Sequence, residues 1–118
     1  MASLADYLLT YSIKTSKFRI TPREKEEAQK KAKAVRDAIA DIDHPDWEKV
    51  EDVETTFKGS FLMETISPPM KRLKAEEIVT NKFESILKQE DASHYWVSIT
   101  CQMMVENAGE SFSFVVYT

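Results

Sequence analysis

The sequence predicts an α+β fold in which two amphipathic helices cover one face of a mostly antiparallel sheet. Residues 6–13 and 95–105 alternate between apolar and polar side chains, which is the period of a strand. Residues 22–42 and 71–90 carry apolar side chains every three or four positions, which is the period of a helix packed on a core. The elements follow in the order β-α-β-α-β-β, so we expect a two-layer sandwich.

The first helix has the clearest boundary in the chain. It follows the strand at residues 6–13 and a basic loop at residues 14–20. The Thr21 hydroxyl can accept from the first backbone amides, and Pro22 suits the first helical position. Glu24 can complete a capping box with Thr21. We expect this helix to continue to Ile42, just before His44 and Pro45.

The second half of the chain predicts a strand, a helix and a hairpin. The strand is expected at residues 50–64, where Gly59 marks a bulge, a bend or the tip of a hairpin. Ser67, Pro68 and Pro69 are expected to form a turn before the helix at 71–90. Residues 106–110 form the predicted turn between strands at 95–105 and 112–116. If Gly59 turns the chain, the sheet gains a further strand.

The pattern indicates one domain that spans residues 1–118, because the 118-residue chain contains no repeat, linker or low-complexity tract. A ferredoxin-like arrangement, or a close variant of it, is the most economical topology for this order of elements. In that arrangement both helices cover the same face of the sheet.

Composition excludes several classes of site. The chain has two glycines, so glycine-rich phosphate loops are absent, and its single cysteine, Cys101, excludes an intrachain disulfide and a thiolate-rich metal site. Cys101 lies on the apolar face of a predicted strand and is expected to be buried. His44 and His94 have no recognisable nucleophile beside them. We therefore expect no catalytic residues, no metal and no cofactor.

The apolar content and the net charge indicate where the protein is located and whether it binds a membrane or nucleic acid. The chain has no apolar run near the roughly 20 residues that a membrane helix needs, and its N-terminus does not resemble a signal peptide. A cytoplasmic protein without membrane contact is expected. The net charge of −4 disfavours a general nucleic-acid binder.

Charge is unevenly distributed along the chain. Residues 14–36 contain nine basic residues and three glutamates, whereas residues 41–54 contain one lysine and seven acidic residues, namely Asp41, Asp43, Asp46, Glu48, Glu51, Asp52 and Glu54. One interpretation is solvated surface, and the other is a pair of complementary patches that orient a partner. A calcium loop is disfavoured, because Pro45 occupies a ligand position and Asp46 stands where the loop needs glycine.

The sheet face away from the helices is the second candidate for contact with a partner. Alternation places on it several apolar side chains among serines and threonines, namely Leu8, Leu62, Trp96, Met104, Val115 and Tyr117. Exposed aromatic residues (Trp96, Tyr117 and Trp47) could also stack on nucleic-acid bases, but no RNA-recognition signature is present. Mixed apolar and small polar side chains suit a protein interface. The expected partner-binding residues are therefore Asp41, Asp43, Asp46, Glu48, Trp96, Met104 and Tyr117.

Three segments resemble the small ferredoxin-like proteins of the Cas2 and SinR-like group. They are residues 7–13 (YLLTYSI), 54–57 (ETTF) and 73–78 (LKAEEI), and the resemblance extends over about half of the chain. That family cleaves phosphodiesters with a metal bound by an aspartate at the end of the first strand. Ser12 occupies the matching position, and Asp6 lies at the other end of the strand. The resemblance therefore implies the fold and a dimer, but this chain lacks the family's metal-binding aspartate.

Together these features predict a non-enzymatic protein-binding domain that forms a homodimer. A regulatory protein, or an accessory protein of a phage or mobile element, fits the size and acidity of the chain. The alternative is a Cas2-like metal-dependent nuclease or another nucleic-acid-processing protein.

Overall fold

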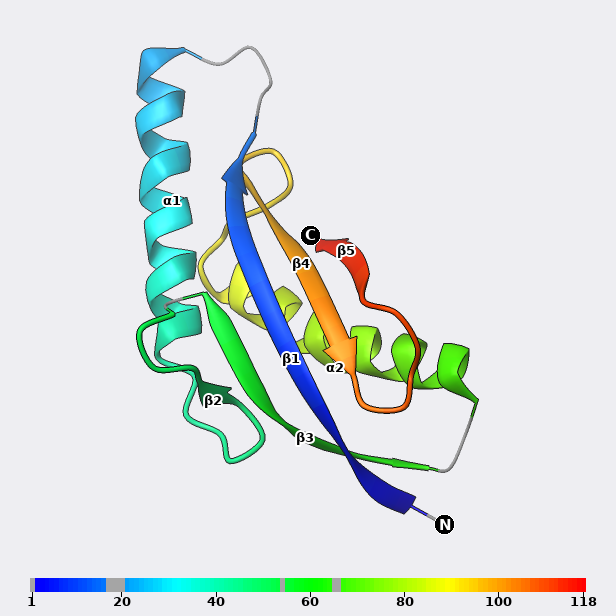
Figure 1. Cartoon of the computed structure of the whole chain (residues 1–118). Helices are drawn as coiled ribbons and strands as arrows, with labels where there is room; N and C mark the ends of the chain where they lie inside the picture. Colours follow the sequence, from blue (N-terminus) through cyan, green and yellow to red (C-terminus); the bar gives the residue numbers. More distant parts are fainter. Residues whose placement is uncertain (1, 17–20, 54, 65–66) are drawn as a thin grey trace.

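Two helices pack against a five-stranded antiparallel sheet (Figure 1). The computed structural model describes residues 2–16, 21–53, 55–64 and 67–118. Along the chain the elements are β1 (Ala2–Thr15), α1 (Pro22–Ala40), β2 (Glu48–Lys49), β3 (Thr56–Glu64), α2 (Pro68–Gln89), β4 (Val97–Val105) and β5 (Phe112–Val116). The predicted α+β class with two helices and an antiparallel sheet is confirmed.

Strand β1 is the centre of the sheet, whose spatial order is β2-β3-β1-β4-β5. Its central residue Tyr7 lies opposite Gly59 of β3 and opposite Val105 of β4. Residues 2–6 of β1 pair with β3 but lie beyond the paired length of β4. The first strand is longer than the predicted 6–13, and β1 occupies the start of the predicted basic loop, whose residues 17–20 lie outside the described part of the chain.

Only one face of the sheet is buried. Alternate side chains of β1, β3 and β4 are buried, including the fully buried Leu9, Phe57 and Ile99. Both helices lie on that side of the sheet, and their own buried residues, such as Val35 of α1 and Phe83 of α2, complete the core. The period-two pattern therefore identified the buried face correctly.

Both helices differ from the prediction at one end. The capping box between Thr21 and Glu24 is present, but α1 ends at Ala40 instead of Ile42. Helix α2 begins at Pro68, so the predicted turn at Ser67, Pro68 and Pro69 is wrong. Proline is favourable at the first positions of a helix because the backbone N–H groups there have no partner within the helix. The two prolines therefore start α2 instead of preceding it.

The predicted strand at residues 50–64 is too long. Residues 50–53 form turns, Val53 is exposed, and β3 begins at Thr56; Glu54 lies outside the described residues. A separate two-residue strand, β2, pairs Glu48 with Lys58 and Lys49 with Phe57. The order along the chain is therefore β-α-β-β-α-β-β, which corrects the predicted β-α-β-α-β-β.

Gly59 is neither a bulge nor a hairpin tip, because the pairing of β1 with β3 runs through it without interruption. Instead, it lets the backbone before β2 pass close to the sheet. A Cβ atom at Gly59 would stand 2.1 Å from the carbonyl oxygen of Asp46 and 3.1 Å from the Tyr7 ring. The Tyr7 hydroxyl donates to that same carbonyl oxygen at 2.5 Å. Glycine is therefore required by close approach of another backbone segment.

Trp47 occupies the space beside this crossing and is 6 % exposed. Its ring contacts the aromatic rings of Tyr7, Phe57, Phe61 and Phe83 at centroid distances of 5.4–6.3 Å. Aromatic pairs at these separations stabilise a core beyond the area that they bury. The suggestion that Trp47 could be an exposed stacking residue is therefore wrong. Its burial fixes the acidic segment against the sheet.

Replacing Gly59 with alanine should destabilise the protein by about 1–3 kcal/mol, because the new methyl group overlaps the Asp46 carbonyl. That carbonyl cannot move freely, since it accepts from Tyr7 and precedes the buried Trp47. Urea unfolding followed by circular dichroism measures the change. The neighbouring Lys58→Ala exchange, at an exposed position of β3, should alter the free energy of unfolding by less than about 0.5 kcal/mol. Equal stability of Gly59→Ala and the wild type would contradict the role assigned to this glycine.

Candidate functional site

The sheet face opposite the helices carries two exposed apolar pairs. Leu4 of β1 lies directly opposite Leu62 of β3, and Leu8 of β1 lies directly opposite Met104 of β4. Leu62 is 67 % exposed and Met104 is 55 % exposed. Side chains that face each other across antiparallel strands are close enough to form a continuous surface. We call the surface of these four residues, together with Val115, the open face.

Polar side chains lie beside the apolar pairs, toward the β5 edge, and also between them, and they bond to one another. Gln102 of β4 donates from Nε2 to the Ser111 hydroxyl at 3.1 Å, and its Oε1 accepts from Ser113. Between the two apolar pairs, the Ser60 hydroxyl donates to the Asp6 carboxylate at 2.6 Å. These internal hydrogen bonds lower the number of polar groups that a partner would have to satisfy.

The predicted open-face residues do not all lie together. Met104 lies in the apolar part, as expected, but Tyr117 follows β5 and stacks on His94 with centroids 4.5 Å apart. Extending the β4–β5 register by one step places Tyr117 opposite Ser98, which is six residues from Met104 along β4. That separation is about 20 Å. Leu4 completes a pair with Leu62 but was not predicted, because β1 begins earlier than its alternation suggested.

Trp96 is not part of the open face. It precedes β4, where the alternation of the strand does not apply, and it packs against the core. The Lys31 ammonium of α1 lies 5.9 Å from the centre of its ring. Lys31 also donates to the Asp91 carbonyl at 2.8 Å, so this cluster joins α1 to the end of α2. The prediction that Trp96 lies on the uncovered side is wrong, and its contacts indicate a structural role.

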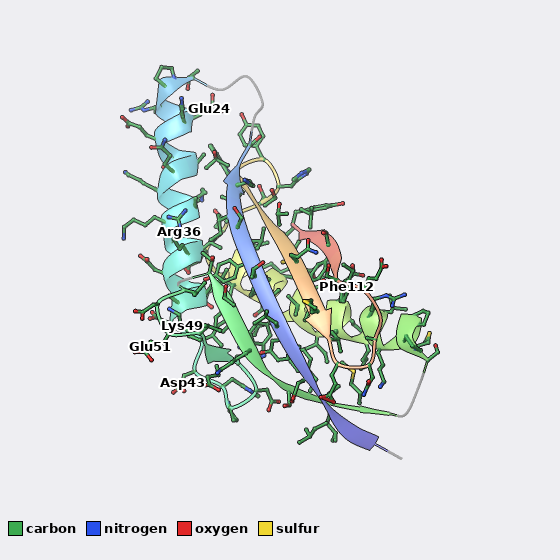
Figure 2. The ribbon with its side chains drawn as sticks, in the orientation of Figure 1. Glu24, Arg36, Asp43, Lys49, Glu51 and Phe112 are labelled. Carbon is green, nitrogen blue, oxygen red and sulfur yellow. The ribbon has the colours of Figure 1, made fainter. Side chains whose placement is uncertain are left out.

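The structure divides the predicted acidic site into two parts. Asp41 is the C-cap of α1 and Asp43 follows it, so both lie beside the helices. Asp46 lies in the turn that brings Trp47 into the core, where its backbone N–H donates to His44 Nδ1 at 3.1 Å. Glu48 belongs to β2 and lies 4.0 Å from the Lys58 ammonium. Figure 2 shows Asp43, Lys49 and Glu51 near one end of α1 and Phe112 on the far edge of the sheet.

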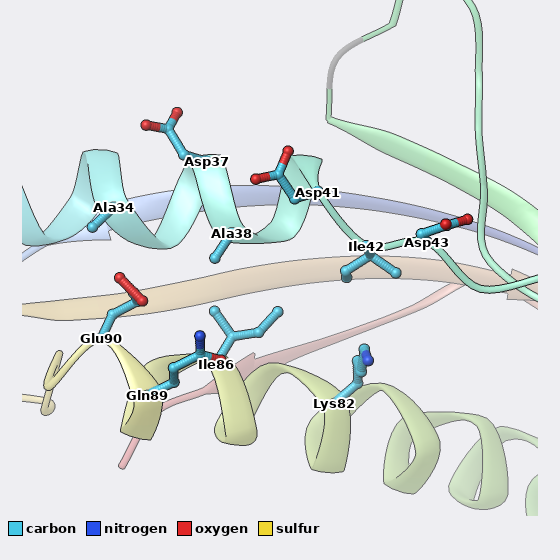
Figure 3. A pocket seen from close by; sticks show the side chains of 10 residues that line it. All are labelled: Ala34, Asp37, Ala38, Asp41, Ile42, Asp43, Lys82, Ile86, Gln89 and Glu90. Carbon is cyan, nitrogen blue, oxygen red and sulfur yellow. The ribbon is translucent and has the colours of Figure 1, made fainter.

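Asp41 and Asp43 line a groove between α1 and α2 with a volume of about 720 Å³. Residues from the last two turns of α2 and its C-cap form the other wall, including Lys82, Ile86 and Glu90 (Figure 3). The sequence placed Asp41 and Asp43 in a charged segment but gave no indication that α2 faces them. The pairing of the two helix ends depends on how both helices pack on the sheet.

The residues of the nuclease alternative do not form a metal site. Asp6 and Glu48 border a small hollow of about 380 Å³ together with Lys58 and Ser60. Ser12 lies on the uncovered side of β1, opposite Thr100. Within the described part of the chain, no group of three or more histidine, cysteine, aspartate or glutamate side chains is arranged to hold a metal ion.

In the described part of the chain, four titratable groups have pKa values shifted by their surroundings, namely Cys101, Tyr7, Glu24 and Tyr95. Burial, and to a smaller extent the charge of Glu76, raises the pKa of the Cys101 thiol to about 12. Burial and the nearby Asp46 charge raise the pKa of the Tyr7 hydroxyl well above its ordinary value. The Tyr95 hydroxyl donates to the Glu24 carboxylate, which lowers the pKa of Glu24 and raises the pKa of Tyr95. None of these side chains belongs to the open face or lines the groove between the helices.

Cys101 should resist alkylation in the folded protein. At about pH 8 a thiol with this pKa is ionised in about one molecule in ten thousand, and the thiolate is the reactive form. Iodoacetamide labelling followed by mass spectrometry should therefore give no modification until denaturant is added. A Ser85→Cys variant supplies an exposed thiol on α2 as the control and should be labelled at once. Labelling of Cys101 at the rate of this control would contradict the assigned burial.

Among the residues that the structure describes, no helix combines the length and apolar character needed to cross a membrane. Comparison of the chain with protein-family models, with curated proteins and with solved structures gives no match.

Proposed function

We propose that this chain is a non-enzymatic protein-binding domain that forms a homodimer through its open face. The observation that carries the proposal is the uncovered side of the sheet, on which two cross-strand apolar pairs remain exposed. A sheet with one covered face ordinarily presents polar side chains to water on the other. Two exposed apolar pairs, which the Asp6–Ser60 pair separates along β1, instead favour burial against a partner.

The size of the open face supports a dimer of modest stability. Strands lie about 4.8 Å apart and rise about 3.3 Å per residue, so five strands and the nine-residue β4 define a face of at most about 20 by 30 Å, since β2 and β5 are shorter. Two such faces would bury at most about 1,200 Å² in total. That area is at the lower end of specific, stable interfaces.

A two-fold symmetric arrangement suits this surface. In a symmetric dimer the same patch is used by both copies, so the apolar pairs of one protomer can meet those of its partner. Sheets that pack face to face interdigitate their side chains at a spacing of about 10 Å. The hydrogen-bonded side chains of Gln102 and Ser113, toward the β5 edge, would then lie beside the apolar contact with these hydrogen bonds already formed.

We also propose that the fold is a ferredoxin-like variant with one added strand. The elements from β1 to β4 follow the order β-α-β-β-α-β, which is the ferredoxin-like succession. In the order β2-β3-β1-β4, the outer strands are β2 and β4, each of which follows a helix in the chain. Strand β5 extends the sheet beyond β4. In this proposal β5 widens the open face.

The dimer can be tested by placing charges on the open face. In sedimentation equilibrium at micromolar concentration, the wild type should have twice the chain mass of 13.6 kDa. The Leu62→Glu/Met104→Glu variant should have the mass of one chain, because burial of unpaired carboxylates is strongly unfavourable. Both side chains are more than half exposed, so the variant should still fold.

The matched control carries the same added charge on the helical side. Gln29 of α1 and Asn81 of α2 are exposed, and the Gln29→Glu/Asn81→Glu variant should remain dimeric. A monomeric wild type, or dimers in both variants, would argue against the open face as the interface. Circular dichroism verifies that each variant is folded.

Nuclease activity supplies the test of the alternative. Labelled DNA and RNA incubated with the protein and either Mg²⁺ or Mn²⁺ should remain intact, since Ser12 stands where the similar family has its metal-binding aspartate. The Asp6→Ala variant and a triple Asp41→Ala/Asp43→Ala/Asp46→Ala variant are the controls. Cleavage that disappears in either variant would replace the binding role with an enzymatic one.

A further inference from the structure

The groove between the two helices differs in character from the open face. Figure 3 shows α1 and α2 running past it in opposite directions, on the same side of the strands. Its volume of about 720 Å³ is within the range of ligand-binding clefts. The groove lies on the helical side of the sheet, so a partner here would not compete with one on the open face.

The floor of the groove is apolar. Ala34 and Ala38 of α1 point toward α2, followed by Ile42 after the end of the helix, while Ile86 of α2 points back toward them (Figure 3). The three α1-side residues are half-buried and Ile86 is buried. Small alanine side chains leave the space between the helices open. An aliphatic chain can therefore lie along this floor.

The rim of the groove is acidic. Asp37, Asp41, Asp43 and Glu90 line it, against the single cation Lys82. Asp37 is engaged with Lys33 on its own helix at 2.9 Å. Among the described residues, Asp41, Asp43 and Glu90 form no ion pair within 4 Å. The groove therefore keeps three carboxylates whose charge is not neutralised by a neighbouring cation.

Helix polarity strengthens this negative potential. Asp41 is the C-cap of α1 and Glu90 is the C-cap of α2, so a helix C-terminus lies at each end of the groove. A helix C-terminus carries about half a negative charge and ordinarily favours basic side chains nearby. The last turn of α1 contains no basic residue, whereas the last turn of α2 contains Lys88. Carboxylates at these positions repel the helix dipoles, and a bound cation would relieve the repulsion.

We propose that this groove binds a basic amphipathic helix of a partner protein. Lysine and arginine combine an aliphatic stem with a cationic head, so their stems can cover the alanine and isoleucine floor while their heads reach the acidic rim. Complementary charge selects such a helix over acidic or neutral ones. The inference rests on the proposed binding role but not on the dimer.

The length of the groove defines the spacing of the basic residues. Ala34 and Asp41 are seven residues apart, which corresponds to about 10 Å along α1. Glu90 lies toward the Ala34 end and Asp43 toward the opposite end (Figure 3). A partner helix with basic residues about two turns apart would place one cation at each end of the groove, as helices commonly dock in grooves through residues spaced by whole turns.

A synthetic helix tests the proposal directly. The probe is a fluorescein-labelled, helix-forming peptide of alanine, leucine and lysine, with lysines spaced one and two turns apart on one face. A second peptide has glutamate at every lysine position. Fluorescence anisotropy should show binding of the lysine peptide, weakened by added salt, and no binding of the glutamate peptide. Failure of the lysine peptide to bind, or equal binding of both peptides, would overturn the proposal.

Two triple variants locate the binding site. Asp41→Asn/Asp43→Asn/Glu90→Gln removes three charges from the groove, and Asp46→Asn/Glu48→Gln/Glu51→Gln removes three charges outside it. The first variant should raise the dissociation constant of the lysine peptide by about tenfold or more, and the second should raise it by less than about threefold. Equal weakening would mean that overall charge, not the groove, attracts the peptide, and would overturn the assignment.

A variant that binds more tightly than the wild type must be folded, so a gain of affinity cannot result from a folding defect. Lys82→Gln removes the one cation of the groove and should tighten binding of the lysine peptide by about threefold; unchanged or weaker binding would count against the groove. The Leu62→Glu/Met104→Glu variant should bind the peptide as the wild type does. Loss of the dimer and loss of peptide binding are therefore separable results.

Discussion

The one-sided burial of the central strand β1 determines on which side of the sheet the helices pack and which face stays exposed. It pairs with β3 on one side and β4 on the other, and it buries only one row of its side chains, including Leu9 and Tyr11. Both helices must then lie on that same side, because their apolar stripes need the same core. Two consequences follow from this one-sided burial. The opposite row, with Leu4 and Leu8, stays exposed, and the space between the helices remains as a groove.

The crossing of Asp46 over Gly59 holds the acidic segment against the sheet. The Tyr7 hydroxyl, 39 residues away in sequence, donates to the Asp46 carbonyl, and the next residue, Trp47, enters the aromatic core. A segment rich in acidic side chains is thereby held by an uncharged residue. The crossing also separates the carboxylates into two groups, since Asp41 and Asp43 line the groove while Glu48 lies on β2.

The two surfaces would use different forces. Contact through the open face would depend on removing leucine and methionine side chains from water, which salt does not weaken by screening. Contact in the groove would depend on charge around a small apolar floor, so it would decline as ionic strength rises. Because one surface lies on the sheet side and the other on the helix side, a dimer could hold two basic helices at once (Figure 1). Such a protein would join partners instead of transforming a substrate.

Local sequence determined the capping box at Thr21 and the alternation of buried and exposed side chains within the strands. That alternation also placed Leu8, Leu62 and Met104 on the open face. Both features depend on residues that are near one another in sequence. It did not determine the two-residue β2, the burial of Trp47 or the role of Gly59, which depend on contacts between distant segments. Trp96 was placed wrongly because alternation holds only inside a strand. Only tertiary packing placed Asp41, Asp43 and Glu90 around one groove, because the sheet on which both helices pack brings them together.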